Sequence, residues 1–193
     1  IKEFHYPKEE VPALEQIKFA IKEGDTLGIV GKTGAGKTTI IKLLMREYDS
    51  YKGQIKFGGR SIKEYSLDAL LRSIGYVPQD HFLFSMTIRD NIRFSDPQLS
   101  AEKVEEAASS AFINQEIKAL PKGYDTLVGE RGVSLSGGQK QRISIARALI
   151  QSPELLILDD ALSAVDAKTE EAILHNLKAV SYTHLRAHET RSN

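Results

Sequence analysis

The sequence predicts an α/β fold with a mainly parallel core sheet, N-terminal antiparallel strands and a helical subdomain between about residues 80 and 140. Three observations predict it. Strand patterns alternate with helix patterns, a glycine-rich segment joins one strand to one helix, and an apolar strand near residue 155 ends in two carboxylates. With 193 residues, the chain is long enough to bury a hydrophobic core.

The sequence of the first half of the chain predicts four strands and one helix. Residues 19–31 read as two strands about a turn, and residues 53–59 and 73–79 read as short strands, the last ended by a proline. Residues 37–48 predict a helix, because apolar side chains recur at helical spacing. These side chains are Ile40, Ile41, Leu44, Met45 and Tyr48.

The second half is mainly helical around one buried strand. Residues 101–119 are rich in Ala, Glu and Lys and predict helices, and Ser136 resembles the N-cap of a helix from about 137 to 150. Residues 154–160 predict a buried strand with carboxylates at its C-terminal end. A last helix is expected at 168–179.

Composition excludes several classes of protein. The 26 basic residues balance 26 acidic ones, which gives no electrostatic case for a nucleic-acid partner. The absence of Cys excludes disulfides and thiolate metal sites. No apolar run approaches the roughly 20 residues that a membrane span needs. Because the chain opens at Ile1 in a strand-like segment, we expect it to be part of something longer.

A phosphate-binding loop is predicted between a strand and a helix, as in a P-loop NTPase core. The segment matches G-x-x-x-x-G-K-[ST], and its glycines let successive N–H groups face phosphate oxygens at a helix N-terminus. Its lysine can reach the β- and γ-phosphates, and its hydroxyl can bind Mg²⁺. The residues are Gly31, Lys32, Thr33, Gly34, Ala35, Gly36, Lys37 and Thr38, followed by Thr39.

Asp159 ends the hydrophobic strand "LLILD" and is the second candidate for the metal site. We expect it to hold Mg²⁺ through water opposite Thr38. A lone Asp after a core strand is often only an acidic turn, but here a phosphate-binding loop precedes it in the same chain.

A second motif points to one family. The segment "LSGGQ", followed by "KQRISIARAL" and "LLILDD", closely resembles the signature of ATP-binding-cassette (ABC) proteins. The resemblance implies that two such domains sandwich two ATP molecules head to tail, each signature helix facing the partner's nucleotide. It covers residues 1 to about 178, with a helical subdomain that carries the signature. The signature residues are Leu135, Ser136, Gly137, Gly138 and Gln139.

The resemblance also implies roles for three further residues. Gln79 in "YVPQD" resembles the Q-loop glutamine, which touches Mg²⁺ or the attacking water and adjoins the membrane domain. Asp166 in "ALSAVD" resembles the D-loop residue at the dimer interface. Tyr6 stands where family members place an aromatic that stacks on adenine, although a strand Tyr before Pro is also ordinary. His5, His81 and His175 are expected to have surface or packing roles.

Two stretches resemble exporter-type members of the family. These are "PQDHFLFSMTIRDNI" and "TLVGERGVSLSGGQ". In the second, the Gly129–Gly132 loop, with Glu130 and Arg131, would face the intracellular loops of a membrane domain. Taken alone, it is a solvated charged turn. The resemblance thus implies a domain at the cytoplasmic face of the cell membrane, with a membrane domain on the same parent chain.

Asp160 departs from the family pattern, which usually has Glu after the preceding aspartate. Glu is the general base that polarises the attacking water. The shorter Asp side chain draws the carboxylate back, and such a base works only within about 2.6–3.2 Å of its proton. We therefore expect this site to bind ATP and hydrolyse it slowly, which favours a heterodimer with a competent partner site.

The segment from about Val180 to the end fits the pattern poorly. "SYTHLRAHETRSN" resembles one reading frame of a transposase sequencing adapter, so residues 180–193 are expected to be non-native and the domain to comprise residues 1–179. Neither His184 nor His188 is expected to be the family's switch histidine. We expect the loss of a core strand here to leave "LLIL" partly uncovered.

The function predicted from these features is that of an ATP-hydrolysing domain that powers export of a substrate across a membrane. One alternative is a regulatory half-site that binds ATP while a partner domain turns it over. A second is a soluble ABC-type ATPase of DNA repair or chromosome structure. That class usually separates the phosphate loop from the signature by coiled coils or zinc modules, which this sequence lacks.

Overall fold

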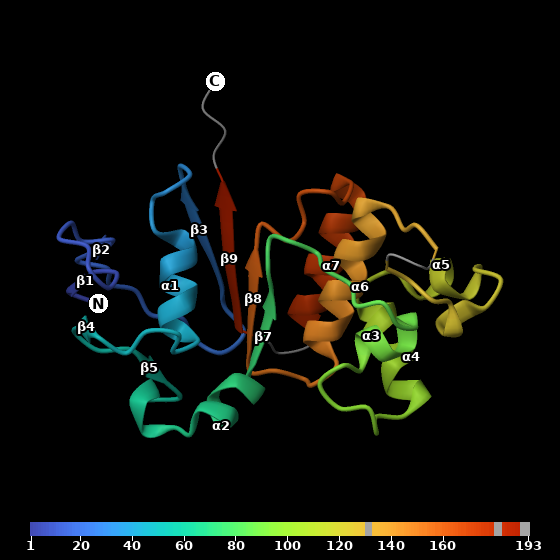
Figure 1. Cartoon of the computed structure of the whole chain (residues 1–193), viewed down its shortest axis with the longest axis horizontal. Coiled ribbons are helices and arrows are strands. Elements are labelled where there is room, and N and C mark those ends of the chain that lie inside the picture. The colour runs from blue at the N-terminus through green and yellow to red at the C-terminus, as the bar shows by residue number, and fades with distance from the viewer. Residues whose placement is uncertain (130–132, 180–182, 190–193) are drawn as a thin grey trace.

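The computed structural model describes residues 1–129, 133–179 and 183–189 (Figure 1). The predicted fold class is confirmed. The strands are β1 (Glu3–Phe4), β2 (Leu14–Glu15), β3 (Thr26–Gly31), β4 (Tyr51–Lys52), β5 (Lys56–Phe57), β6 (Arg60–Ser61), β7 (Ile74–Val77), β8 (Leu155–Asp159) and β9 (Thr183–Glu189).

Helices separate most of the strands along the chain. The α-helices are α1 (Lys37–Leu44), α2 (Leu67–Arg72), α3 (Ile88–Ile92), α4 (Ala101–Ser110), α5 (Asn114–Lys118), α6 (Gly137–Leu149) and α7 (Ala167–Ala179), and the 3₁₀ turns are η1 (Ile62–Glu64) and η2 (Gly123–Asp125). No helix in the described ranges has the length and apolar character that crossing a membrane requires.

The central sheet has the order β3-β9-β8-β7, and all its strand pairs are parallel. Strand β8 is buried along its whole length, because helices cover both faces of the sheet at this strand. Leu155 and Ile157 pack in one cluster with Ile41 of α1. Leu156 and Leu158 face the opposite way, into the cluster that includes α6 and α7. Figure 1 accordingly shows α1 and α6 on opposite sides of the sheet.

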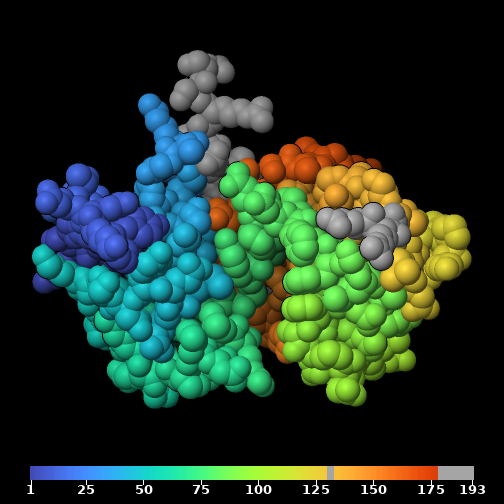
Figure 2. All heavy atoms as spheres, in the orientation of Figure 1, coloured from blue at the N-terminus to red at the C-terminus, as the bar shows by residue number. Residues whose placement is uncertain are grey.

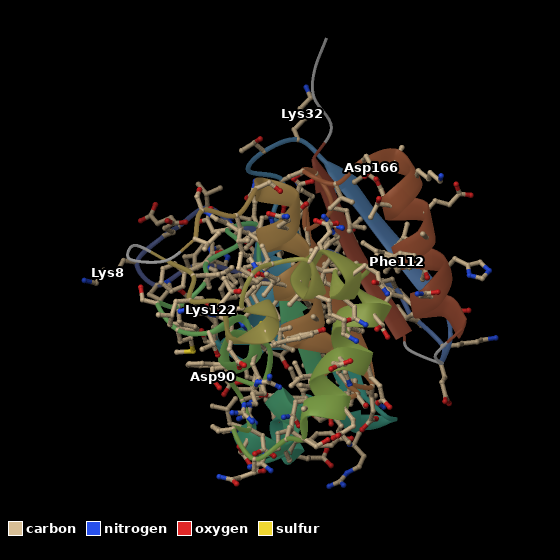
Figure 3. The ribbon with its side chains drawn as sticks, turned by 90° about the vertical axis from the view of Figure 1, so that its right-hand side faces the viewer. Lys8, Lys32, Asp90, Phe112, Lys122 and Asp166 are labelled. Carbon is tan, nitrogen blue, oxygen red and sulfur yellow. The ribbon has the colours of Figure 1, made fainter. Side chains whose placement is uncertain are left out.

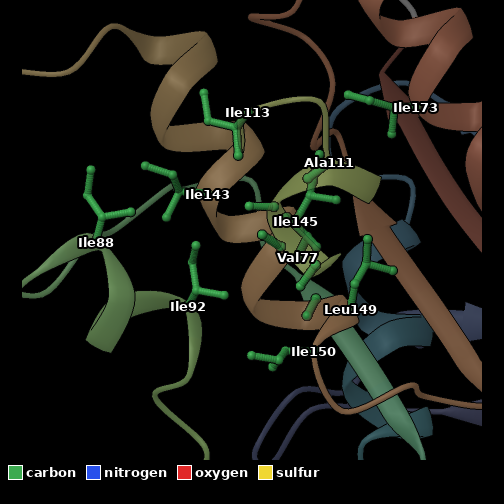
Figure 4. Close-up of a cluster of buried hydrophobic side chains, with 14 of the residues drawn as sticks. Val77, Ile88, Ile92, Ala111, Ile113, Ile143, Ile145, Leu149, Ile150 and Ile173 are labelled. Atoms are coloured by element: carbon green, nitrogen blue, oxygen red, sulfur yellow. The ribbon is translucent and has the colours of Figure 1, made fainter. Parts of the chain in front are cut away.

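The helical part of the molecule and one face of the central sheet share a hydrophobic core, part of which Figure 4 shows around α3 and α6. Ile88 and Ile92 of α3 meet Ile143 and Ile145 of α6, and all four side chains are almost fully buried. In Figure 2 this part, green to yellow, forms a lobe beside the blue-to-teal N-terminal part. Because this cluster also includes Val77 of β7 and Leu156 and Leu158 of β8, the fold places the signature segment on a helix that packs directly against the central sheet.

The N-terminal antiparallel strands form a three-stranded sheet of order β2-β1-β4. The predicted strand at residues 19–22 is wrong, since of residues 19–31 only 26–31 form a strand, β3. Phe19 is 44% exposed, so its apolar side chain is not covered by a neighbouring element. Residues 53–59 contribute only the two residues of β5, which pair with β6 in a hairpin.

The expected loss of a core strand after residue 180 is wrong. Residues 183–189 form β9, which lies between β3 and β8 and pairs with both. A ladder needs backbone N–H and C=O groups rather than a particular side-chain pattern, so an extended chain after α7 can fill this gap. "LLIL" is consequently buried, whereas Val30 on β3 is 61% exposed. His184 and His188 lie within this strand rather than after it. That residues 180–193 are non-native stays a prediction.

Candidate functional site

The phosphate-loop segment connects β3 to α1 at the carboxyl edge of the central sheet. Gly34 and Gly36 both have a left-handed backbone, with φ of 81° and 85°. A Cβ on Gly36 would lie 2.6 Å from Cδ2 of Leu14 and 3.0 Å from the carbonyl oxygen of Ala13. Only glycine therefore fits at this position, for both its torsion and its surroundings.

Lys37 begins α1 and is 7% exposed. Its Nζ donates to the carbonyl oxygens of Gly31 at 2.8 Å and Lys32 at 3.0 Å, so the ammonium group lies against the backbone of the loop. Burying a positive charge is costly unless acceptors surround it. The loop therefore fixes a positive charge beside the N-terminus of α1, where the helix dipole also favours an anion.

Asp159 lies next to this loop although it is 121 residues away from Thr38 in sequence. Thr38 Oγ1 donates to its Oδ2 at 3.2 Å, and the Asp159 side chain is buried at the end of β8. Burial raises the pKa of Asp159 above its usual range, and nearby Asp160 adds to the rise, although Thr38 and Lys37 oppose it. Tyr76 of β7 also hydrogen-bonds to this carboxylate, and burial together with Asp159 raises the pKa of Tyr76 to about 12.

The donors at this point fit Mg²⁺. Mg²⁺ prefers hard oxygen ligands and usually takes one or two carboxylates, with phosphate oxygens and water completing its shell. Thr38 and Asp159 present a hydroxyl and a carboxylate together. Within the described ranges no group of three or more His, Asp or Glu side chains could hold a metal ion. A metal here would therefore depend on oxygens of a phosphate ligand as well.

Gln79 and Asp160 lie at the same edge of the sheet. Val77 of β7 pairs with Leu158 of β8 in parallel register, so the residues that follow these strands emerge side by side. Gln79 is exposed, and Asp160 is half-buried with φ of 51°. A left-handed backbone at a non-glycine residue is uncommon and costs free energy, so the sharp turn after Asp159 is a specific feature of this site.

Tyr6 stands beside α1 rather than apart from the site. Its hydroxyl lies 2.8 Å from Oγ1 of Thr39, and its ring makes edge contacts with Phe4 and Tyr48 at centroid distances of 5.1 and 5.4 Å. The ring remains half-exposed. The tyrosine is thus fixed at the margin of the phosphate loop, and stacking on adenine stays a prediction.

The signature segment forms the N-terminus of α6. Ser136 is the N-cap, its Oγ accepts from the backbone N–H of Gln139, and the Gln139 side chain accepts from the N–H of Ser136. Leu135 is buried beneath this end, whereas Gly137 and Gly138 pack against Ala164. Gln139 also donates to Glu116 of α5, which pairs with Arg142 one turn further along α6.

Asp166 caps α7, since its Oδ1 accepts from the backbone N–H of Thr169 at 3.0 Å. Hydrogen bonds from the side chain of Thr169 and from its backbone N–H lower the pKa of Asp166. Figure 3 shows Asp166 and Lys32 toward the same end of the molecule. The structure thus joins the phosphate loop, Asp159 and Tyr6 in one place and puts the signature on another helix. Glu130 and Arg131 lie outside the described residues.

Sequence reasoning missed two residues of this region, Tyr76 and Gln141. Tyr76 approaches Asp159 only through the pairing of β7 with β8, and that register cannot be read from the sequence. Gln141 is fully buried in α6. The sequence did indicate it, because Gln141 lies on the same face of the helix as the apolar Ile145 and Ala148. A polar amide on a buried face needs hydrogen-bond partners.

Comparisons with known proteins agree with this geometry. Residues 14–163 match the protein-family model described as ABC transporter. The chain is 50% identical over 178 residues to the multidrug resistance-like ATP-binding protein MdlA of Escherichia coli, covering 92% of this chain and 30% of the relative. MdlA of Buchnera aphidicola is 53% identical over 175 residues, or 91% of this chain and 30% of the relative.

A solved structure of an ABC exporter also resembles this chain. A bacterial Atm1-family ABC exporter with ATP bound superposes with a TM-score of 0.91 at 39% identity, covering 98% of this chain and 33% of the exporter chain. The chain therefore spans about a third of the length of the proteins that it matches.

Proposed function

The chain belongs to the ABC transporter family and is an ATP-binding domain of the kind found in multidrug exporters, and from this premise we propose that it powers export by ATP-driven dimerisation. ATP binding closes two such domains around two nucleotides, and hydrolysis reopens them. The observation that carries the proposal is the contact of Thr38 with Asp159 beside the buried ammonium of Lys37, in a chain that also presents the capped signature end of α6.

The phosphate loop binds the triphosphate in this proposal. Backbone N–H groups of Gly31–Thr38 and the Lys37 ammonium donate to phosphate oxygens, and Tyr6 stacks on the adenine. Thr38, Asp159 and Gln79 would hold Mg²⁺, and the ion would supply positive charge next to the phosphate oxygens. Asp160 orients the attacking water, because it directly follows Asp159 at the edge where Gln79 also emerges.

The membrane part of the transporter lies outside this chain in the proposal. The relatives are named ATP-binding/permease or multidrug proteins, and this chain spans about 30% of their length. Gln79 and the Gly129–Gly132 loop contact that membrane domain at the cytoplasmic face of the membrane. Two domains meet head to tail, with Asp166 at their interface, and the short Asp160 favours a heterodimer. The membrane helices choose the substrate.

The length of the Asp160 side chain limits hydrolysis at this site. A carboxylate that is misplaced by about 1 Å can slow a reaction on the order of 100-fold. The substitution Asp160→Glu extends the side chain by one methylene and restores the usual family residue. We expect the hydrolysis rate to rise at least tenfold while the dissociation constant for ATP changes less than about twofold. The measurement is single-turnover hydrolysis with protein in excess over ATP.

The control is Asp68→Glu, which makes the same change on the exposed surface of α2. An unchanged rate in Asp160→Glu would show that reach is not limiting. ATP binding without hydrolysis in both the unmodified chain and Asp160→Glu would favour the regulatory half-site instead. The comparisons lend that alternative no support.

A further inference from the structure

The side chain of Gln139 is occupied at both ends, although Gln139 belongs to the signature segment. Its Oε1 accepts from the backbone N–H of Ser136 at 2.9 Å, and its Nε2 donates to Oε2 of Glu116 at 3.0 Å. A side-chain amide has one acceptor oxygen and one donor NH₂ group, so both of its polar groups already bond within the chain. The Gln139 side chain therefore faces its own domain rather than an external ligand.

Glu116 is held in turn by Arg142 of α6. The guanidinium group donates to both carboxylate oxygens of Glu116, at 2.5 and 3.1 Å. It also donates to the carbonyl oxygens of Gly138 at 3.2 Å and Phe112 at 2.8 Å, and the Arg142 side chain is only 13% exposed. The hydrogen bonds thus form a closed ring, which runs from Gln139 through Glu116 and Arg142 back to the first turn of α6.

The hydrophobic core fixes the position of Glu116. Ile113 and Ile117, on either side of it in sequence, are almost fully buried in the core that also contains Ile143 of α6. The Glu116 side chain lies at the rim of this core, where it meets Arg142. A bidentate pair between an arginine and a carboxylate has a defined geometry, unlike a pair between two mobile surface side chains. The pair therefore gives Gln139 a fixed support.

The ion pair also balances a charge that an anion would otherwise meet. No acidic residue lies in the first turn of α6, and Glu116 is the carboxylate that reaches this end through Gln139. Burial alone would raise the pKa of Glu116, but hydrogen bonds from Arg142 and Gln139, together with the charge of Arg142, lower it. Because Arg142 neutralises this carboxylate, the helix dipole can still favour a phosphate at the N-terminus of α6.

The first turn of α6 still has donors to offer to such a phosphate. Ser136 Oγ accepts from the N–H of Gln139 at 3.2 Å, and a hydroxyl that accepts one bond can donate its own proton in another. No residue in the described part of the chain accepts from the backbone N–H of Gly137 or Gly138. The first N–H groups of a helix have no intrahelical partner, so they need an acceptor from outside.

We propose that Glu116 and Arg142 are positioning residues for the ATP of a partner domain: together they hold the Gln139 amide against its own chain, so that this amide does not touch the nucleotide. The phosphates then meet the Ser136 hydroxyl and the backbone N–H groups of the first turn. This inference rests on the proposed function and divides the signature into residues that touch the ligand and one that supports them. Its structural part can be tested without nucleotide.

The first experiment follows the Ser136 amide by hydrogen exchange in the whole chain, without nucleotide. Glu116→Gln keeps the size of the side chain but replaces one acceptor oxygen by a donor NH₂ group, so Gln139 and Arg142 compete for one oxygen. We expect Ser136 exchange to accelerate at least about threefold, because a hydrogen bond to a charged group is lost. The control is Lys118→Ala, which breaks an ion pair between α5 and Glu105 of α4 and should leave the Ser136 rate unchanged.

A reversed pair checks that the hydrogen bond itself is responsible. Adding Gln139→Glu to Glu116→Gln places the amide at position 116 and the carboxylate at position 139, which reverses the direction of the bond. The carboxylate at position 139 can also accept from the N–H of Ser136, as in an ordinary capping box. Ser136 exchange should therefore return to within about twofold of its rate in the unmodified chain. Exchange as fast as in Glu116→Gln alone would contradict the assigned bond.

The second experiment separates positioning from nucleotide binding. Sedimentation velocity with Mg²⁺-ATP measures association of the chain with a second copy, and displacement of a fluorescent ATP analogue measures binding to single chains. We expect Glu116→Gln to weaken association about tenfold or more, while the dissociation constant for ATP changes less than about twofold. A general loss of structure would weaken both, so this split identifies a positioning role.

A third comparison asks whether Glu116 acts through Gln139. Gln139→Ala should weaken association by about the same factor as Glu116→Gln, and the two substitutions together should weaken it no further, because each breaks the same path. Additive losses would mean that Gln139 touches the nucleotide itself, which would overturn the inference.

Two further results would also overturn it: equal Ser136 exchange in Glu116→Gln and the unmodified chain, or equal association of Glu116→Gln and Lys118→Ala. Failure of the unmodified chain to associate when Mg²⁺-ATP is bound would instead contradict the proposed function. The Ser136 exchange rates, which need no nucleotide, would then decide the positioning role alone.

Discussion

The N-termini of α1 and α6 are both proposed to meet phosphate, yet they are built differently. At α1 the N-cap is Gly36, which has a left-handed backbone and offers no side-chain hydrogen bond to the first turn. At α6 the N-cap is Ser136, which forms a reciprocal capping box with Gln139. The first helix end depends on the backbone of its loop, whereas the second is closed by its own side chains.

This difference suits the two helix ends to different roles toward nucleotide. Without a side-chain cap, the first-turn N–H groups of α1 suit an external anion, and the buried ammonium of Lys37 adds positive charge beside them. The capping box of α6 satisfies the backbone N–H groups of Ser136 and Gln139, and Ala164 packs against Gly137 and Gly138. In the proposed function, α1 would bind the nucleotide of its own chain and α6 would be a preformed surface for the nucleotide of a partner.

The largest expected loss of stability comes from adding a single methyl group at the N-cap of α1. The substitution Gly36→Ala combines a left-handed torsion with a contact of 2.6 Å to Leu14, and should lower the free energy of unfolding by about 3 kcal/mol. Gly34→Ala is the matched control, since it has the same kind of torsion but nothing within 4 Å of its Cβ. It should cost about 1 kcal/mol. Denaturant unfolding measures both, and equal losses would show that the Leu14 contact is unimportant.

A smaller change, a gain in stability, is expected from a substitution at Asp159 beside the N-terminus of α1. Burial raises the pKa of Asp159, so the folded state binds its proton more readily than the unfolded state above pH 3.8. The ionised group therefore lowers stability at pH 7. Asp159→Asn should raise the free energy of unfolding by about 1 kcal/mol at pH 7 and change it little below pH 3.8.

The control for this effect is Asp68→Asn, which alters an exposed ion pair on α2 and should change stability by less than about 0.5 kcal/mol. Urea unfolding at several pH values provides the measurement. A less stable Asp159→Asn protein at pH 7 would mean that the contacts with Thr38, Lys37 and Tyr76 outweigh burial.

A loss of stability similar in size to the Asp159→Asn gain is expected at the N-terminus of α6. Ser136→Ala removes one half of the capping box and should lower the free energy of unfolding by about 1 kcal/mol. Ser100→Ala provides the comparison, because Ser100 caps α4 through a single bond of 3.4 Å to the N–H of Lys103. Its loss should be smaller, at about 0.5 kcal/mol. If the two losses are equal, the reciprocal bond from Gln139 adds nothing to the cap.

Much of this arrangement could be predicted from the sequence, where the signal was local. The phosphate loop, the apolar strand before Asp159 and the Ser136 cap each occupy one continuous segment. Contacts across segments could not be predicted, because they depend on strand register and helix packing. Tyr76 meets Asp159 through the β7–β8 pairing, and His81 meets Gln141 across 60 residues.

The errors have the same origin. Residues 19–22 have a strand-like sequence but pair with no strand, because propensity alone does not supply a neighbouring strand. Conversely, residues 183–189 lack a regular apolar pattern, yet they form β9 because they pair with β3 on one side and with β8 on the other. In both places the available backbone partners decide the outcome.

The most direct test measures binding of Mg²⁺-ATP to single chains, at concentrations low enough to keep them monomeric. Displacement of a fluorescent ATP analogue compares Lys37→Ala with Ser136→Ala. We predict that Lys37→Ala weakens binding about 30-fold or more, because a charge-assisted hydrogen bond is lost, and that Ser136→Ala changes it less than about twofold. Equal weakening by the two substitutions would contradict the claim that the α1 end alone binds the nucleotide of its own chain.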